Sequence, residues 1–206
     1  MIEKRIYETP PVCRQEILRY AGVRQADEVQ EALLDACLRE AEAKLVYRVC
    51  FGEIDIQKCE EMFPSGALQR TLAGCPKAMI FAATIGTEFD RLIQKYAHIS
   101  PAKALMLQAI GTERIEALCD AFCDDMGAST SRFSPGYGDF PIEKQAEIFR
   151  FLAPEKQIGV FLTEKMVMTP SKSVTAIFGV KAGKIYQKTN KCSRCNNFGC
   201  DFRSTL

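Results

Sequence analysis

The sequence predicts an α+β domain: a mostly antiparallel, twisted sheet flanked by helices, with one long central helix and a short cysteine-rich C-terminal tail. The 206 residues fit one domain with a small appendage, and 47% hydrophobic with 26% charged residues supply enough apolar material for a core. Helical and β-like segments follow one another without the regular alternation of a doubly wound sheet. No internal repeat or linker divides the first 187 residues. We therefore expect one domain over 1–187 and a separate tail over 188–206.

The first part of the chain alternates between helical and β-like patterns. Apolar residues recur at helical spacing, and Asp27 stands where a helix N-cap is expected. Two stretches rich in β-branched, aromatic and small apolar residues are typical of strands, the second of them buried. These patterns predict helices over 14–20, 27–47 and 65–73, and strands over 47–56 and 77–85.

The longest helix is predicted over 100–126. Ser100-Pro101 supplies a capping hydroxyl and a first-turn proline at its start. A shorter helix precedes it, with Gly86-Thr87 as turn and N-cap, Asp90 in the first turn and an end near His98. Beyond the long helix, the patterns predict a loop at 127–141, a helix at 142–152 and strands at 157–162, 173–180 and 184–187.

Charge and composition exclude several classes of function. A formal net charge of +1 argues against nucleic acid as the main partner, because phosphate binding needs a basic face. The longest apolar run, Ala78–Gly86, has nine residues and is too short for a membrane span. The first residues lack a signal-peptide core, which favours a cytoplasmic protein. The single histidine, His98, argues against histidine-rich metal sites and a Ser-His-Asp triad.

Ten cysteines are the unusual feature of the composition. We interpret seven of them as small buried residues of a protein in a reducing compartment. The other three form a C-x2-C-x4-C cluster in a basic tail, where thiolates suit a zinc ion or an iron–sulfur cluster. The alternative is a solvated basic tail that merely contains cysteines. The seven are Cys13, Cys37, Cys50, Cys59, Cys75, Cys119 and Cys123, and the three candidate metal ligands are Cys192, Cys195 and Cys200.

The loop at 132–141 is the stretch richest in binding chemistry. Arg132 can bind a carboxylate through two hydrogen bonds, and Gly136 allows a close approach of the backbone to a ligand. Tyr137 supplies a flat face and a hydroxyl. Such a loop suits a small zwitterion with an aromatic base. The alternative is an ordinary tight turn.

Further segments give this loop a family resemblance. Over about 100–187 the chain resembles the activation domain of cobalamin-dependent methionine synthase, a family that binds S-adenosylmethionine. The residues that carry the resemblance are the R-x-x-x-G-Y pattern of Arg132, Gly136 and Tyr137, then Leu162-Thr163-Glu164, Met168, Pro170, Ser173 and Val174.

The resemblance implies the ligand contacts. Arg132 would meet the methionine carboxylate, and Gly136 and Tyr137 would line the nucleoside. Tyr186 is similar to the second of a tyrosine pair that contacts the ligand, and Glu113 to an acidic contact for its cationic end. No side chain is implied as a catalytic acid or base.

The chain departs from the family pattern at two places near this loop. Gly138-Asp139-Phe140-Pro141 stands where Ala-Cys-Pro is usual, and Ile185 where the first tyrosine of the pair is expected. The cysteine tail is also foreign to the family domain. We therefore expect a stand-alone form of the domain with an added tail.

The function implied is reactivation in trans, as the methyltransferase component of methionine synthase activity. The chain would support reductive methylation of inactive cob(II)alamin to methylcobalamin. No D-x-H-x-x-G motif surrounds His98, so cobalamin must arrive on a methionine synthase or another corrinoid protein. Electrons would come from a flavodoxin- or ferredoxin-like donor. The alternative is a non-catalytic accessory module that binds a corrinoid protein or a metal through the cysteine cluster.

Overall fold

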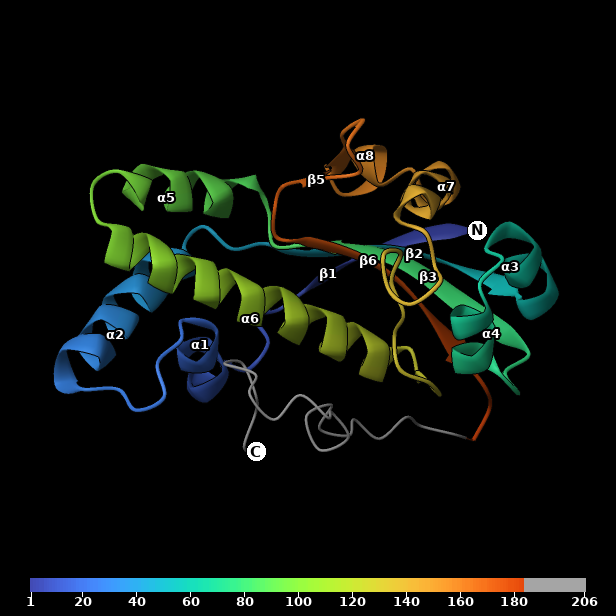
Figure 1. Ribbon diagram of the computed structural model, residues 1–206, viewed down its shortest axis with the longest axis horizontal. Coiled ribbons are helices and arrows are strands. Elements are labelled where there is room, and N and C mark those ends of the chain that lie inside the picture. The colour runs from blue at the N-terminus through green and yellow to red at the C-terminus, as the bar shows by residue number, and fades with distance from the viewer. Residues whose placement is uncertain (184–206) are drawn as a thin grey trace.

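The centre of the fold is a four-stranded antiparallel sheet in the order β1-β2-β3-β6. The structure is a computed structural model and describes residues 1–183. β1 and β6 are the edge strands, and helices cover the sheet on both faces (Figure 1). The strands are β1 (Ile2–Tyr7), β2 (Tyr47–Asp55), β3 (Lys77–Thr84) and β6 (Ser173–Val180). The predicted α+β class with an antiparallel sheet is confirmed.

The helices and a small second sheet surround these strands. The first six helices are α1 (Arg14–Tyr20), α2 (Glu28–Glu42), α3 (Ile56–Met62), α4 (Gly66–Leu72), α5 (Thr87–Ala97) and α6 (Pro101–Asp125). They are followed by η1 (Ile142–Lys144), α7 (Gln145–Leu152), α8 (Pro154–Gln157), and the paired β4 (Phe161–Leu162) and β5 (Met168–Thr169). The long α6 crosses one face of the sheet (Figure 1). None of the helices in residues 1–183 is long and apolar enough to span a membrane.

The strand β3 separates two hydrophobic cores. It is buried from Ala78 to Thr84, because it pairs with β2 and β6 and has helices on both faces. Successive side chains of a strand point to opposite faces. Phe81 therefore joins one core with α1, α2, α5 and α6, and Ile80 joins the other with α3, α4 and α7. On the first face, the Phe122 ring of α6 lies 4.9 Å from the Phe81 ring, which fixes α6 on the sheet.

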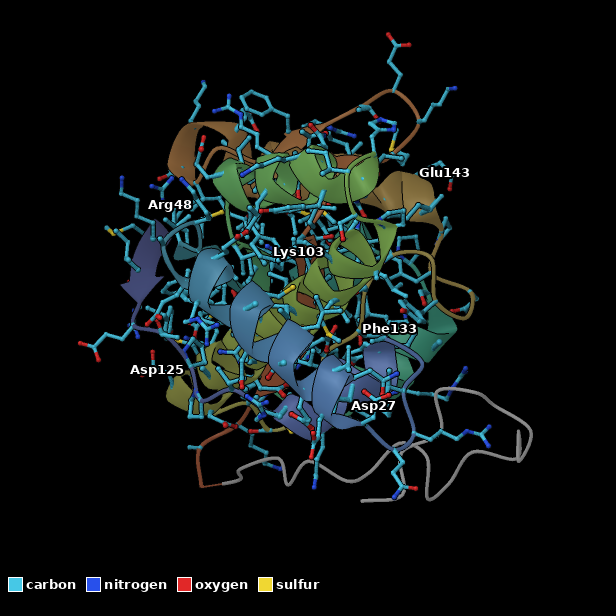
Figure 2. The ribbon with its side chains drawn as sticks, turned by 90° about the vertical axis from the view of Figure 1, so that its left-hand side faces the viewer. Asp27, Arg48, Lys103, Asp125, Phe133 and Glu143 are labelled. Carbon is cyan, nitrogen blue, oxygen red and sulfur yellow. The ribbon has the colours of Figure 1, made fainter. Side chains whose placement is uncertain are left out.

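The starts of α2 and α6 follow the sequence prediction at Asp27 and Pro101, but the Ser100 hydroxyl makes no capping hydrogen bond. Asp27 begins α2 with a capping box, accepting from the Gln30 amide at 2.8 Å (Figure 2). The Ser65 hydroxyl accepts from the Leu68 amide at 3.1 Å and begins α4. Pro101 stands in the first turn of α6, as predicted.

Two helix predictions need correction. The first helix after Asp27 ends at Glu42 and not near Tyr47, since Tyr47 pairs with Tyr7 in β1. The N-cap of α5 is Gly86, with no side-chain hydrogen bond, so Thr87 does not cap this helix. Asp90 lies in the first turn as predicted, and its carboxylate accepts from the Ser171 amide at 2.6 Å and the Ser171 hydroxyl at 2.8 Å. Asp90 therefore ties α5 to the segment before β6.

The predicted strand over 157–162 is wrong over most of its length. Pro154 starts the single turn α8, since its fixed φ suits a first helical position. Gly159, at φ +76°, then lets the chain turn, and only Phe161–Leu162 pairs with β5. β1 and α3 were not predicted. The predicted strand at 184–187 lies outside the described residues.

Candidate ligand-binding site

The loop after α6 is held against the sheet by its two phenylalanines. The Phe133 amide donates to the Ile177 carbonyl of β6 at 2.8 Å, and the Ile177 amide donates back at 2.9 Å. The Phe140 ring is buried, stacks on Phe133 at 6.3 Å and meets Phe63 edge-on at 5.8 Å. Buried aromatic contacts of this kind fix both ends of the loop. Between the two phenylalanines, residues 136–139 form an exposed turn.

Asp139 attaches the same loop to the start of α4. Its carboxylate accepts from the Ser65 hydroxyl at 2.5 Å, the Gly66 amide at 2.9 Å and the Ala67 amide at 3.0 Å. The hydrogen bond from Ser65, followed by those from the backbone, lowers the pKa of Asp139. The departure from the family pattern at 138–141 thus has a structural role: Asp139 binds a helix N-terminus, and Phe140 fills the core.

The tip of the loop exposes its tyrosine. Gly136 has φ +91°, a conformation that favours glycine, and its amide donates to the Phe140 carbonyl at 2.8 Å. The turn leaves the Tyr137 side chain 67% exposed. Gly136 and Tyr137 therefore belong to an exposed turn, and the Tyr137 ring is accessible to solvent.

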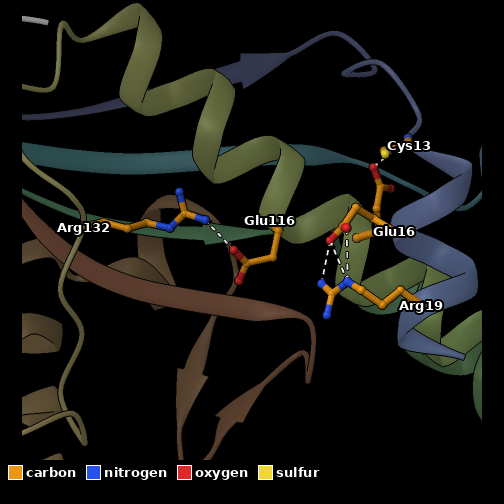
Figure 3. A network of polar contacts seen from close by, with 6 residues as sticks. Cys13, Glu16, Arg19, Glu116 and Arg132 are labelled. Atoms are coloured by element: carbon orange, nitrogen blue, oxygen red, sulfur yellow. Dashed lines mark hydrogen bonds and ion pairs between the residues drawn. The ribbon is translucent and has the colours of Figure 1, made fainter. Parts of the chain in front are cut away.

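Arg132 lies between two carboxylates of α6. Its Nη2 donates to Glu116 (Figure 3). Its Nη1 donates to Asp120, four residues further along the same helix face. The Arg132 side chain is 16% exposed, whereas that of Glu116 is 43% exposed. The guanidinium is therefore fixed and charged, and the more accessible of its two acids is Glu116.

Helix α1 lies beside this pair. Figure 3 shows Glu116 between Arg132 and the pair formed by Glu16 and Arg19, whose Nη2 and Oε2 are 2.5 Å apart. The Arg19 guanidinium lies over the Tyr20 ring at 4.3 Å. Burial raises the pKa of Tyr20, and the negative charge of Glu116 raises it further. Acids, two arginines and Tyr20 from α1, α6 and the loop thus lie close to one another.

Glu113 faces the N-terminal segment. It is buried and accepts from the Cys13 amide at 3.0 Å and from Arg114 Nη2 at 2.6 Å. Arg114, also buried, donates to the carbonyls of Pro10 at 2.6 Å and Pro11 at 2.7 Å. Glu113 therefore holds residues 10–13 on α6, and its predicted ligand contact stays a prediction.

Sequence reasoning missed Glu116 and Asp120. Both follow Glu113 at the spacings of three and seven residues, which place side chains on one side of a helix. That acidic periodicity was the available signal. This periodicity does not reveal which acid pairs with Arg132, because Arg132 lies in the loop that follows α6 and its position depends on the fold.

The cysteines of the described residues are structural with one exception. Six of the seven are buried and free, as predicted, whereas Cys13 is exposed. Burial raises the pKa of Cys37 and Cys123 to about 11, and of Cys50 and Cys59 to about 12. Within residues 1–183 no group of three His, Cys, Asp or Glu side chains is placed to hold a metal. Tyr186, Cys192, Cys195 and Cys200 lie outside the described residues.

Comparison with known proteins supports the family resemblance. The family model described as "Vitamin B12 dependent methionine synthase, activation domain" matches residues 126–197, a range that includes Arg132, Gly136, Tyr137 and Tyr186. The crystal structure of the MetH reactivation domain bound to AdoHcy has the same fold, with a TM-score of 0.61 and 16% identity over 91% of this chain and 80% of that one. No curated protein sequence matches the chain. The resemblance to the activation domain of cobalamin-dependent methionine synthase is therefore confirmed, by a family model around the R-x-x-x-G-Y loop and by a solved fold.

Proposed function

We propose that the chain binds S-adenosylmethionine on the face formed by α1, the C-terminal half of α6 and the loop 132–138. The observation that carries the proposal is Arg132, held on α6 by Glu116 and Asp120 within the family-matched segment, five residues before the exposed Tyr137. The AdoHcy bound to the similar reactivation domain, which is the demethylated form of this ligand, supports the same ligand class here.

The ligand carboxylate replaces Glu116 on Arg132 in this proposal. Asp120 continues to hold Nη1, so the guanidinium keeps its position while Nη2 becomes available. The ligand carboxylate then accepts a charge-assisted hydrogen bond from Nη2 in place of Glu116. Glu116, once released, is an anion beside the ligand's cationic groups. Tyr137 offers its ring face to the adenine, and Gly136 lets the backbone approach the nucleoside.

Glu113 and Tyr186 complete the predicted contacts. Glu113 is committed to Arg114 and the Cys13 amide, so its contribution to binding includes holding the N-terminal segment in place. The role of Tyr186 rests on the family resemblance and on its place within the matched range 126–197.

We propose that the bound ligand serves reductive methylation of cob(II)alamin on a separate polypeptide, either a methionine synthase or another corrinoid protein. S-Adenosylmethionine supplies the methyl group, and a flavodoxin- or ferredoxin-like protein supplies the electron. This chain's residues bind and orient the methyl donor; no side chain acts as acid or base. The sequence has no D-x-H-x-x-G motif, so cobalamin belongs to the partner. Six buried, free thiols fit a reducing compartment such as the cytoplasm.

The cysteine-rich tail, 188–206, is proposed as a metal or docking segment appended to a domain over 1–187. Cys192, Cys195 and Cys200 have thiolate spacing for zinc or an iron–sulfur cluster, and the surrounding lysines and arginines suit an acidic electron donor. Iron, sulfide and zinc analysis of anaerobically purified protein tests this. If the protein contains no iron, sulfide or zinc, the metal role of the tail is excluded and only docking of a partner protein remains, in line with the accessory-module alternative.

Calorimetry with S-adenosylmethionine tests the binding proposal. Arg132→Ala is expected to weaken binding by at least about tenfold, because a hydrogen bond to a charged group contributes about 1.5–3 kcal/mol. Arg150→Ala, at an exposed position of α7, is the matched control and should bind as the wild type does. If the Arg132 and Arg150 variants bind S-adenosylmethionine with equal affinity, the proposed binding site at Arg132 is wrong. Absence of binding by the wild-type chain leaves the accessory module.

The activity is tested spectroscopically. A candidate corrinoid protein in the cob(II)alamin state is incubated with reductant, S-adenosylmethionine and this chain. Appearance of methylcobalamin that requires the chain, and is lost with Arg132→Ala, supports reactivation in trans. If no corrinoid protein yields methylcobalamin although the chain binds the ligand, the reactivation proposal fails.

A further inference from the structure

A cavity lies away from the Arg132 face. It has a volume of about 340 Å³ and is lined mainly by the segment 9–14 and by the C-terminal half of α2. This size is at the lower end of the range of small-molecule sites, about 300–1,000 Å³. Neither the loop 132–138 nor its partners on α6, Glu116 and Asp120, contribute to the lining.

One wall of the cavity is apolar. Val12 from the N-terminal segment contributes to this wall, together with Leu38 and Ala41 of α2 and Leu45, which follows α2. Ala41 is fully buried, and Leu38 and Leu45 pack against the core. Because the core holds this wall in place, it offers a preformed surface to the aliphatic part of a ligand.

Three charged side chains of the lining already have partners. Arg14 donates to Asp35, which also lines the cavity, at 2.6 Å and to Glu31 at 2.5 Å. Arg114 is buried and forms an ion pair with Glu113. These pairs tie the N-terminal segment to α2 and α6, so their charges are committed to the fold.

Arg39 and Glu42 are the charged lining residues that remain. Both are exposed, and within residues 1–183 neither side chain forms an ion pair or a hydrogen bond. Arg39 lies in the last turn of α2, and Glu42 is the final residue of that helix. Residues three positions apart lie on one helix face, with Cβ atoms about 5–6 Å apart. The cavity is therefore bordered by one cation and one anion, side by side.

This arrangement matches the charged end of a free α-amino acid. The ammonium and carboxylate groups of an amino acid are attached to the same carbon atom, so they need a cation and an anion close together. A guanidinium binds a carboxylate through charge-assisted hydrogen bonds, and a carboxylate binds an ammonium in the same way. The C-terminal end of a helix carries partial negative charge, which further favours an ammonium group beside Glu42.

We propose that this cavity binds a free α-amino acid with an aliphatic side chain. Arg39 binds the α-carboxylate, and Glu42 binds the α-ammonium group. The apolar wall of Val12, Leu38 and Leu45 contacts the side chain of the amino acid. This site is separate from the proposed S-adenosylmethionine site, because the two have no residue in common.

The test uses L-leucine and three probes that each lack one part of it. Isoamylamine lacks the carboxylate, 4-methylpentanoate lacks the ammonium group, and L-serine lacks the aliphatic side chain. Binding to the full chain is followed by NMR of the methyl groups of Val12, Leu38 and Leu45. L-Leucine should shift these methyl signals and bind roughly fivefold more tightly than isoamylamine or 4-methylpentanoate, the upper range for an exposed ion pair. L-Serine should leave the methyl signals in place.

Variants assign each charge to its partner. Arg39→Gln should bind L-leucine no more tightly than isoamylamine, and Glu42→Gln should bind it no more tightly than 4-methylpentanoate. Both variants should keep the melting temperature of the wild type, because neither side chain has a partner within residues 1–183. Lys44→Gln, at an exposed position outside the lining, is the matched control and should bind L-leucine as the wild type does.

Several outcomes would overturn the site. These are the absence of methyl shifts at millimolar L-leucine, shifts that map elsewhere, equal binding of L-leucine and isoamylamine by the wild type, and unchanged L-leucine binding by Arg39→Gln. A marked fall in the melting temperature of either variant would show that its charge stabilises the fold, and would also count against the proposal. Arg132→Ala should leave L-leucine binding unchanged, which separates a failure here from a failure of the S-adenosylmethionine proposal.

Discussion

Replacing Glu113 by glutamine should destabilise the domain through the charge that it leaves behind. Glu113 and Arg114 have side chains that are 5% and 1% exposed, respectively, and their carboxylate and guanidinium are 2.5 Å apart. Glutamine has nearly the same shape and can still accept from the Cys13 amide. The change therefore isolates the loss of negative charge beside a buried cation.

The expected loss of unfolding free energy is about 3–5 kcal/mol, the usual consequence of removing one partner of a buried ion pair. In a domain of this size, about 2–4 °C of melting temperature corresponds to 1 kcal/mol, so the midpoint should fall by roughly 6–20 °C. Glu116→Gln is the matched control. Its carboxylate is 43% exposed and Arg132 keeps Asp120, so the control should lose at most about 1 kcal/mol.

Urea unfolding of both variants, followed by circular dichroism, measures the difference. S-Adenosylmethionine affinity is measured below both transitions, where both variants are folded. We expect Glu113→Gln to lose stability while its folded molecules bind the ligand nearly as well as the wild type. We expect Glu116→Gln to keep its stability and to bind the ligand more weakly.

Equal losses of stability in the two variants would refute the account of Glu113 as a buried structural anion. If Glu113→Gln instead keeps its stability and loses ligand affinity, the contact implied by the family resemblance is correct, and Glu113 reaches the ligand directly.

Three further outcomes are expected. Iodoacetamide under native conditions should modify Cys13 before any of the six buried cysteines in residues 1–183, as judged by peptide mass spectrometry. Phe140→Ala should lose about 3–5 kcal/mol in urea unfolding, because it empties a fully buried site. The lowered pKa of Asp139 means that its contribution is complete above the ordinary value of 3.8 and is lost as the pH falls through the lower folded-state pKa. The stability difference between wild type and Asp139→Asn should therefore disappear on acidification, in a pH series of urea melts. A difference that persists at low pH would contradict the role of the carboxylate.

Local sequence signals were sufficient for most elements of the fold. The sequence predicted the buried strand β3, the N-cap at Asp27 and the first-turn Pro101 correctly. Each of these features depends only on residues that are close together in the sequence. β1 was not, since most of its residues are exposed and only pairing with β2 makes it a strand. The misassigned 157–162 shows the same limit, because an apolar run alone does not distinguish a strand from a turn.

For the candidate site, the sequence by itself determined the loop chemistry: an arginine, a glycine and a tyrosine within six residues. Only the tertiary structure decided what surrounds them. Asp139 binds Ser65 across 74 positions, Glu113 binds Cys13 across 100, and Arg132 selects Glu116 and Asp120 from several acids of α6. Contacts between residues so far apart depend on how helices pack on the sheet. Propensity and spacing act over a few residues only, so they could place the loop but not its partners.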